Sequence, residues 1–317
     1  MGTYSITTMR DQIFNGMKND LPDSEIADFV TTSHLVGGRD EFHNVASDLA
    51  RLRRYQLACL VVEAGLKLYP HDTDLLANYL SFGVKSGNDE KANGYYSELA
   101  RLPKELYTWR SFTFTIDYLL HCYSQEKEED ERKKIKESVQ KVLALYKERF
   151  PKEERAYIAE FEVGEAFGAT DEELLGILKN GIAVIAVSPQ CCLKFVDRSL
   201  ELGNYDDAIR YAPKGLSASA QDQESVDTGY FYYAMALAMD AKWYDPECKD
   251  AKGDDYAQQI LKNYRAADVS LDSNKTTYRK LLRKRSNMIA TEIGTDLPYP
   301  IAESTDELMS ILRSVSE

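Results

Sequence analysis

Several patterns that mark enzymes and membrane proteins are missing from this chain. None of the sequences HExxH, GxxxxGK(S/T), GxSxG or GxGxxG occurs in its 317 residues, and the four histidines lack the spacing of metal ligands. No apolar stretch is long enough to span a bilayer, and no secretory signal is visible at the N-terminus. We therefore expect a non-enzymatic cytoplasmic protein without cofactor, metal or membrane span.

Cysteine pairs and positive charge are also scarce. The five cysteines are scattered without a CxxC pair, which predicts thiols rather than disulfides in a reducing compartment, and the adjacent Cys191 and Cys192 are best explained as small buried residues. Lysine and arginine number 39 against 52 aspartate and glutamate residues, for a net charge of −13. Because a phosphate-backbone binder needs a positive field, this balance argues against nucleic acid as the main partner.

A period of 34 residues organises what is present. Ala58 and Ala92 lie one period apart inside similar local patterns, and so do Leu174 and Ala208. Seven residues further on, each of these frames holds a glycine or leucine: Gly65, Leu99, Gly181 and Gly215. Such a period is typical of stacked helix pairs, each too small to bury its own apolar face and dependent on its neighbours.

Apolar residues at helical spacing divide the chain into three regions. Residues 1–38 are predicted to form two short capping helices, residues 39–268 about six helix pairs, and residues 269–317 further capping helices. The closing region holds an amphipathic helix at 275–293 and a short last helix at 303–316 with Leu308, Ile311 and Leu312 on its apolar side. Thr170, with Glu173 three residues later, predicts a capping box at a helix start.

Two segments resemble the tetratricopeptide repeat. Residues 200–209 (LELGNYDDAI) are similar to that family's turn between paired helices, and residues 64–70 (AGLKLYP) to its repeat end, within a resemblance that covers residues 40–268. The resemblance implies an all-α fold: a right-handed α-solenoid of about six stacked helix pairs with helical caps at both ends. It also implies that the first helix of each pair lines an inner groove that binds peptides, protein tails or other helices.

Two asparagines are the first candidates for ligand contact. Asn44 and Asn78 hold the same place one period apart, each within the first helix of its pair. Because a side-chain amide both donates and accepts hydrogen bonds, two of them on neighbouring helices could hold the backbone of an extended peptide. The plainer interpretation is that both are ordinary exposed polar side chains.

Charged and aromatic residues complete the predicted partner-binding surface. The cations are Lys85, Arg110 and Lys194, and the acids that oppose them are Asp117, Glu160 and Asp197. The mixed signs argue against a pure carboxylate clamp, which needs several converging cations. Tyr232, with Phe231 and Met235, could furnish an apolar pocket near the C-terminal end, although such spacing is more often part of a core.

Three functions remain open from the sequence. The leading hypothesis is an adaptor or scaffold that binds a protein or peptide in its groove. A second is a ligand-sensing regulator in which a peptide or small effector compacts the repeats. A third, an accessory subunit of an enzyme complex, would be recognised by co-purification with a catalytic chain.

Overall fold

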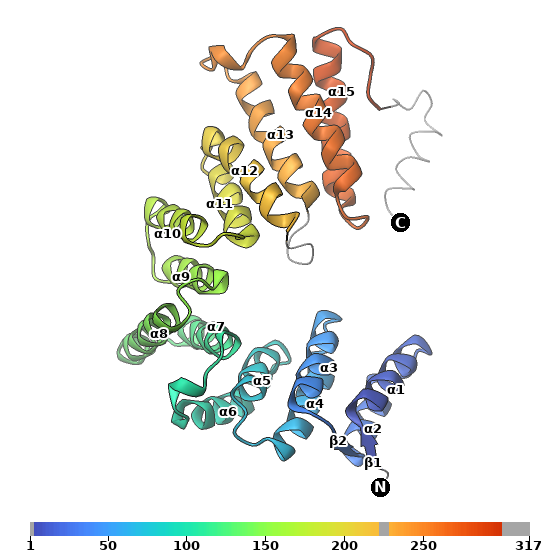
Figure 1. Cartoon of the computed structure of the whole chain (residues 1–317), viewed down its shortest axis with the longest axis vertical. Helices are drawn as coiled ribbons and strands as arrows, with labels where there is room; N and C mark the ends of the chain where they lie inside the picture. Colours follow the sequence, from blue (N-terminus) through green and yellow to red (C-terminus); the bar gives the residue numbers. More distant parts are fainter. Residues whose placement is uncertain (1–2, 222–227, 300–317) are drawn as a thin grey trace. The chain divides into compact units, whose positions relative to one another are not determined.

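The structure, a computed structural model, describes residues 3–221 and 228–299 of the chain. Within these residues fifteen α-helices carry the fold, and the two short strands pair only with one another (Figure 1). The chain divides into two compact units, residues 1–168 (unit 1) and residues 169–317 (unit 2). The all-α fold of successive helix pairs that the sequence predicts is confirmed. The last helix predicted at 303–316 lies outside the described residues.

Unit 1 begins with a helical pair between two strands and continues as helical hairpins. Its elements are β1 (Thr3–Ser5), α1 (Ile6–Lys18), α2 (Asp23–Thr32), β2 (His34–Val36), α3 (Arg39–Arg51), α4 (Tyr55–Leu68), α5 (Thr73–Lys85), α6 (Asp89–Arg101), η1 (Lys104–Leu106), α7 (Trp109–Gln125), α8 (Glu129–Arg149) and α9 (Glu154–Ala166).

A two-stranded parallel sheet joins the ends of the N-terminal segment. β1 pairs with β2 in the register Thr3 to His34, Tyr4 to Leu35 and Ser5 to Val36, with α1 and α2 as the crossover. The two predicted helices are present, but the sequence interpretation missed this sheet, because three-residue strands are too short to show an alternating pattern. Ile6, Met9 and Ile13 of α1 are buried, which attaches the segment to the core of unit 1.

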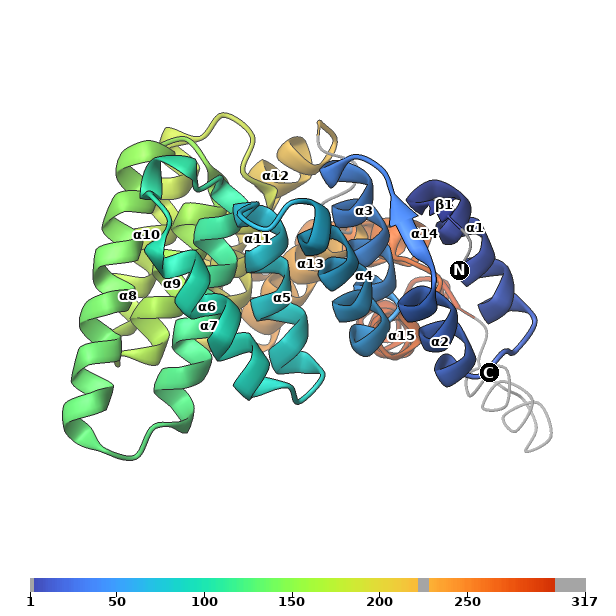
Figure 2. The same cartoon turned by 90° about the horizontal axis from the view of Figure 1, so that it is seen from below.

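Each hairpin of unit 1 is completed by the next one. α3 packs on α4, α5 on α6 and α7 on α8, while α5 also contacts α3, α4 and α7 (Figures 1 and 2). The apolar side chains that fill these contacts include Phe42, Leu49, Val62, Leu76, Tyr79, Phe112, Ile116 and Tyr146. Burial of one such side chain contributes about 1.5–3 kcal/mol, so apolar contacts within and between hairpins hold the stack together.

Three of the turns within hairpins share one backbone conformation. Gly87 after α5 and Gly203 after α11 (Pro189–Glu201) adopt positive φ angles of 78° and 71°, where glycine is favoured. The following amides, of Asn88 and Asn204, donate to carbonyls of the preceding helix over 2.8 Å each. Arg53 occupies the same place after α3 with φ of 60°. The positive φ angle explains why glycine precedes asparagine in two of these turns, at Gly87-Asn88 and at Gly203-Asn204.

Unit 2 contains longer helices. Its elements are α10 (Asp171–Val184), α11, α12 (Tyr205–Ser219), α13 (Thr228–Tyr244), η2 (Lys249–Ala251), α14 (Asp254–Ser270) and α15 (Thr276–Glu292).

A buried ion pair joins three helices of unit 2. Asp240 of α13 is 1% exposed and accepts hydrogen bonds from Arg285 of α15 over 2.7 and 2.6 Å and from Tyr264 of α14 over 2.8 Å. A buried carboxylate is tolerated only when such partners replace water. At the start of the unit, the capping box predicted at Thr170 and Glu173 is confirmed.

Three glycines and a leucine recur in the repeat pattern, and two of the glycines lie where helices approach closely. All four, Gly65, Leu99, Gly181 and Gly215, are buried. A β-carbon added at Gly65 would lie 3.0 Å from Phe42, and one added at Gly215 would lie only 2.2 Å from Phe231. The absence of a side chain at Gly215 therefore lets α12 and α13 come into contact.

The substitution Gly215→Ala tests this contact. The new methyl group would overlap Phe231, which is fully buried, so we expect the free energy of unfolding to fall by about 1–3 kcal/mol in chemical denaturation. Gly176→Ala is the matched control, since no atom lies within 4 Å of the added β-carbon in α10. That variant should gain about 0.5–1 kcal/mol from helix propensity. Equal responses of the two variants would refute the close approach.

Candidate functional site

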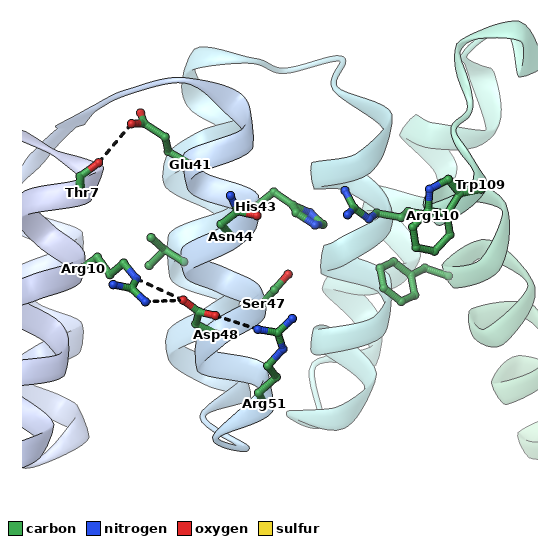
Figure 3. A pocket seen from close by; sticks show the side chains of 12 residues that line it. Thr7, Arg10, Glu41, His43, Asn44, Ser47, Asp48, Arg51, Trp109 and Arg110 are labelled. Atoms are coloured by element: carbon green, nitrogen blue, oxygen red, sulfur yellow. Dashed lines mark hydrogen bonds and ion pairs between the residues drawn. The ribbon is translucent and has the colours of Figure 1, made fainter. Parts of the chain in front are cut away.

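A hollow of about 620 Å³ opens on unit 1 between α1, α3 and α7. We call it the α3–α7 hollow. Its lining residues are Thr7, Arg10, Glu41, His43, Asn44, Val45, Ser47, Asp48, Arg51, Trp109, Arg110 and Phe114 (Figure 3). Most of the lining side chains from α1 and α3 are polar, and α7 contributes Trp109, Arg110 and Phe114. A volume of this size suits a few residues of a peptide or one small molecule.

Internal ion pairs occupy two of the three arginines in the hollow. Asp48 of α3 accepts from Arg10 of α1 over 2.9 Å and from Arg51 one turn further along α3 over 3.2 Å. The other acid, Glu41, accepts from Thr7 over 3.2 Å and from the backbone amide of Gly38 over 2.7 Å. Both carboxylates of the hollow are therefore already used within the protein.

Arg110 differs from these arginines. It forms no ion pair with any residue that the structure describes, and its guanidinium lies 5.0 Å from the ring centre of Trp109. The side chain reaches into the hollow, and His43 points toward it from α3 (Figure 3). A half-buried arginine of this kind can form charge-assisted hydrogen bonds with a bound group.

The buried side-chain amide of Asn78 forms a hydrogen bond with His43. The Nδ2 atom of Asn78, on α5, lies 2.6 Å from Nδ1 of His43, and Asn78 is fully buried. Burial, and secondly the charge of Arg110, lower the pKa of His43, whereas Asp74, Asp40 and Asp72 act in the opposite direction. These effects together favour the neutral ring. Because the Asn78 amide donates to Nδ1, the ring proton lies on Nε2.

A second polar group on unit 1 surrounds Asp117 of α7. The surrounding protein atoms, and then the charge of Glu162 on α9, raise the pKa of Asp117 to about 7. Lys85 and Arg155 act in the opposite direction. Asp117 is nevertheless exposed, so water screens part of this unfavourable environment and the free-energy cost is smaller than full burial would impose.

The structure places the eight predicted site residues in several environments. Asn44, which is exposed, and Arg110 come together in the α3–α7 hollow. Asn78 holds the equivalent place on α5 but is buried beneath His43, so the two asparagines do not form one exposed pair. Lys85 is exposed, with its Nζ 5.7 Å from the ring centre of Tyr55, and its charge acts on Asp117.

The remaining three candidates belong to unit 2. Asp197 of α11 accepts a hydrogen bond from Tyr230 of α13, and burial raises its pKa while Lys194 lowers it. Tyr232 is half-buried and packs on the core of unit 2. Its predicted neighbour Phe231 is fully buried, so that ring belongs to the core.

Several residues of the hollow were missed from the sequence. Ser47, Asp48 and Arg51 follow the predicted Asn44 by three, four and seven residues, which places them on the same helix face, and this signal could have been found. The contact between His43 and Asn78 joins residues 35 positions apart and has no local signal. The helical spacing of Trp109, Phe112 and Ile116 in the sequence predicts an apolar stripe, yet Trp109 also lines the hollow.

Comparisons with known proteins give likeness of fold only. No family model and no curated protein matches the chain. A thermophilic TPR protein of Thermus thermophilus is 20% identical, with 64% of this chain and 99% of that chain covered and a TM-score of 0.48. A tetratricopeptide repeat protein from Parabacteroides merdae is 13% identical, with 89% and 99% covered and a TM-score of 0.46.

The APC/C hetero-tetramer Cut9–Hcn1 is a third similar structure. The identity is 12%, with 87% of this chain and 46% of that chain covered and a TM-score of 0.47. Two of these three structures are named as tetratricopeptide repeat (TPR) proteins. None of the helices in residues 3–221 and 228–299 has the length and apolar character to cross a membrane. The same residues contain no cluster of three or more His, Cys, Asp or Glu side chains suited to a metal ion.

The pH dependence of stability tests the environment of Asp117. The pKa of this carboxyl is about 7 in the folded chain and about 4 in an unfolded one, so the folded state binds the proton more tightly. Stability from this group is therefore present below pH 4 and is lost as the pH rises through 7. In Asp117→Asn this loss is removed, so the melting temperature of the variant relative to the parent should rise between pH 5 and pH 8.

Asp11→Asn provides the control for this measurement, because Asp11 is an exposed residue of α1. Its melting temperature relative to the parent should stay constant over the same interval. A constant difference for Asp117→Asn as well would contradict the raised pKa.

Proposed function

We propose that the chain is a helical-repeat scaffold that binds an extended segment of a partner protein in the α3–α7 hollow. The observation that carries this proposal is the arrangement of Asn44, Arg110 and Trp109 around an open space, with Arg110 not ion-paired within the described residues. Tryptophan and arginine are the residues that most often dominate binding energy at interfaces.

The chemistry of the hollow suits a peptide backbone with side chains of mixed character. Asn44 and Ser47 offer hydrogen-bond donors and acceptors, and both lie on the same face of α3. Trp109 and Phe114 of α7 can cover an apolar side chain. In this proposal the chain positions a partner and carries out no reaction.

Its five cysteines, which are thiols rather than disulfides, support a reducing, cytoplasmic location.

A small effector could also occupy a space of this size, which supports the alternative of a ligand-sensing regulator. The two functions differ in their effect on the chain as a whole. An effector that regulates should change the radius of gyration in X-ray scattering, whereas a scaffold should keep it unchanged on binding a short peptide.

Selection from a random peptide library displayed on phage tests the scaffold function. Peptides that bind the full chain should bind Asn44→Ala/Arg110→Ala at least about tenfold more weakly, because truncation of an interface anchor costs more than about 1 kcal/mol. The melting temperature should hardly change, since both side chains lie at the surface of the hollow.

Arg101→Ala/Asn180→Ala serves as the matched control. It removes the same two residue types at exposed positions that do not line the hollow, and it should bind the selected peptides as the parent does. Selected peptides that bind all three proteins equally would exclude the hollow as the binding site.

A further inference from the structure

Of the three arginines that line the α3–α7 hollow, only Arg110 has no ion pair with an acid of the described residues. Asp48 neutralises Arg10 and Arg51, and Glu41 is engaged by Thr7 and the backbone of Gly38. No carboxylate of the described residues pairs with Arg110. A guanidinium with this freedom presents two parallel N–H groups, a geometry that matches the oxygens of a carboxylate or a phosphate.

His43 supplies a second donor on the same side of the hollow. Its Nδ1 is occupied by the Asn78 amide, so the Nε2–H group is the one available to a ligand. Figure 3 shows His43 and Arg110 pointing toward one another from α3 and α7. Asn44 lines the hollow on the same helix as His43 and can add an amide donor.

We propose that the α3–α7 hollow binds an oxyanion, a carboxylate or a phosphate group, between Arg110 and His43, and that His43 takes up a proton from solvent when the anion binds. The proposal rests on the scaffold function to the extent that the partner segment would carry this group. Beyond the scaffold function, it assigns an oxyanion to the partner segment and makes binding of that anion depend on pH.

The charges around His43 explain why anion and proton would bind together. Asp40 of α3 and Asp72 and Asp74 at the start of α5 favour the imidazolium, whereas Arg110 of α7 opposes it. Asp72 also caps α5, and Asp74 accepts from Ser111 over 2.8 Å, so these acids stay in place. Arg39 of α3 pairs with Asp40 and with Asp72 over 3.4 Å each, so Asp74 is the carboxylate of the three without this cation. An anion on Arg110 would neutralise the opposing charge and leave Asp74, with a smaller contribution from Asp40 and Asp72, to stabilise protonated His43.

Asn78 can serve both protonation states of His43. In the neutral state its Nδ2 donates to Nδ1, and its buried Oδ1 has no hydrogen-bond partner among the described residues. A buried acceptor without a partner is costly. Protonation gives His43 an Nδ1–H group, and a half-turn of the amide would place Oδ1 opposite that donor. After that rotation the oxygen that lacks a partner in the neutral state would accept a hydrogen bond from the protonated ring.

Proton NMR titration of the full chain tests the proposal. The imidazole resonances of His43 are assigned by their loss in His43→Gln and followed from pH 5 to pH 8 with sodium chloride, glutarate or inorganic phosphate at equal ionic strength. We expect the pKa of His43 to rise by about one unit with an anion that binds, which corresponds to about tenfold tighter anion binding at the low end of this range.

Three controls separate the bound anion from general effects. The imidazole resonances of the other histidines, His34, His71 and His121, should not respond to the anion as those of His43 do. Arg110→Gln should abolish the shift, and Arg110→Lys, which keeps the charge without the two parallel N–H groups, should retain part of it. Circular dichroism establishes that both variants fold.

The outcomes distinguish the ligands and the two proposals. A shift with glutarate alone assigns a carboxylate, and a shift with phosphate alone assigns a phosphate. If no anion changes the pKa of His43, or if the change persists in Arg110→Gln, the anion site is overturned. If library peptides bind the hollow while His43 stays unchanged, the scaffold function stands without the anion site. If His43 responds but no peptide binds, the anion site stands and the scaffold function fails.

Discussion

Contact between successive hairpins is the constraint on which this structure depends. A single pair of helices cannot bury its own apolar stripe, and in unit 1 helix α5 is covered by α3, α4 and α7. The close approach of α12 to α13 in unit 2 depends on Gly215, beside the buried ring of Phe231. These contacts place residues one period apart on neighbouring helices, and thereby bring α3 and α7 to the two sides of one hollow.

Ion pairs and hydrogen bonds within the protein determine which side chains of the hollow can bind a ligand. Asp48 holds two arginines, Asp72 caps α5, and Asp74 accepts from Ser111. Each acid is thereby used inside the protein, and only Arg110 is left among the described arginines of the hollow without one. A chain with a net charge of −13 thus presents a local donor site for an oxyanion, which the overall charge conceals.

Position within the stack also separates residues that the sequence presents as equivalent. Asn44 and Asn78 occupy the same place in α3 and α5, but the hollow between α1, α3 and α7 opens beside Asn44, whereas α5 packs on α3, α4, α6 and α7. Asn78 is therefore buried and contacts His43, whereas Asn44 remains exposed in the hollow. The buried amide acts on a ligand only through the histidine that it orients.

Helix content, the order of the helix pairs and the capping box at Thr170 follow from the sequence, because apolar spacing and caps act within a few residues. The pairing of β1 with β2, the contact between His43 and Asn78 and the membership of the hollow were decided by tertiary structure. They join residues tens of positions apart, and no local pattern encodes which of two equivalent side chains a neighbouring helix will cover. The raised pKa of Asp117 has the same origin, since Glu162 and the atoms around it come from other parts of unit 1.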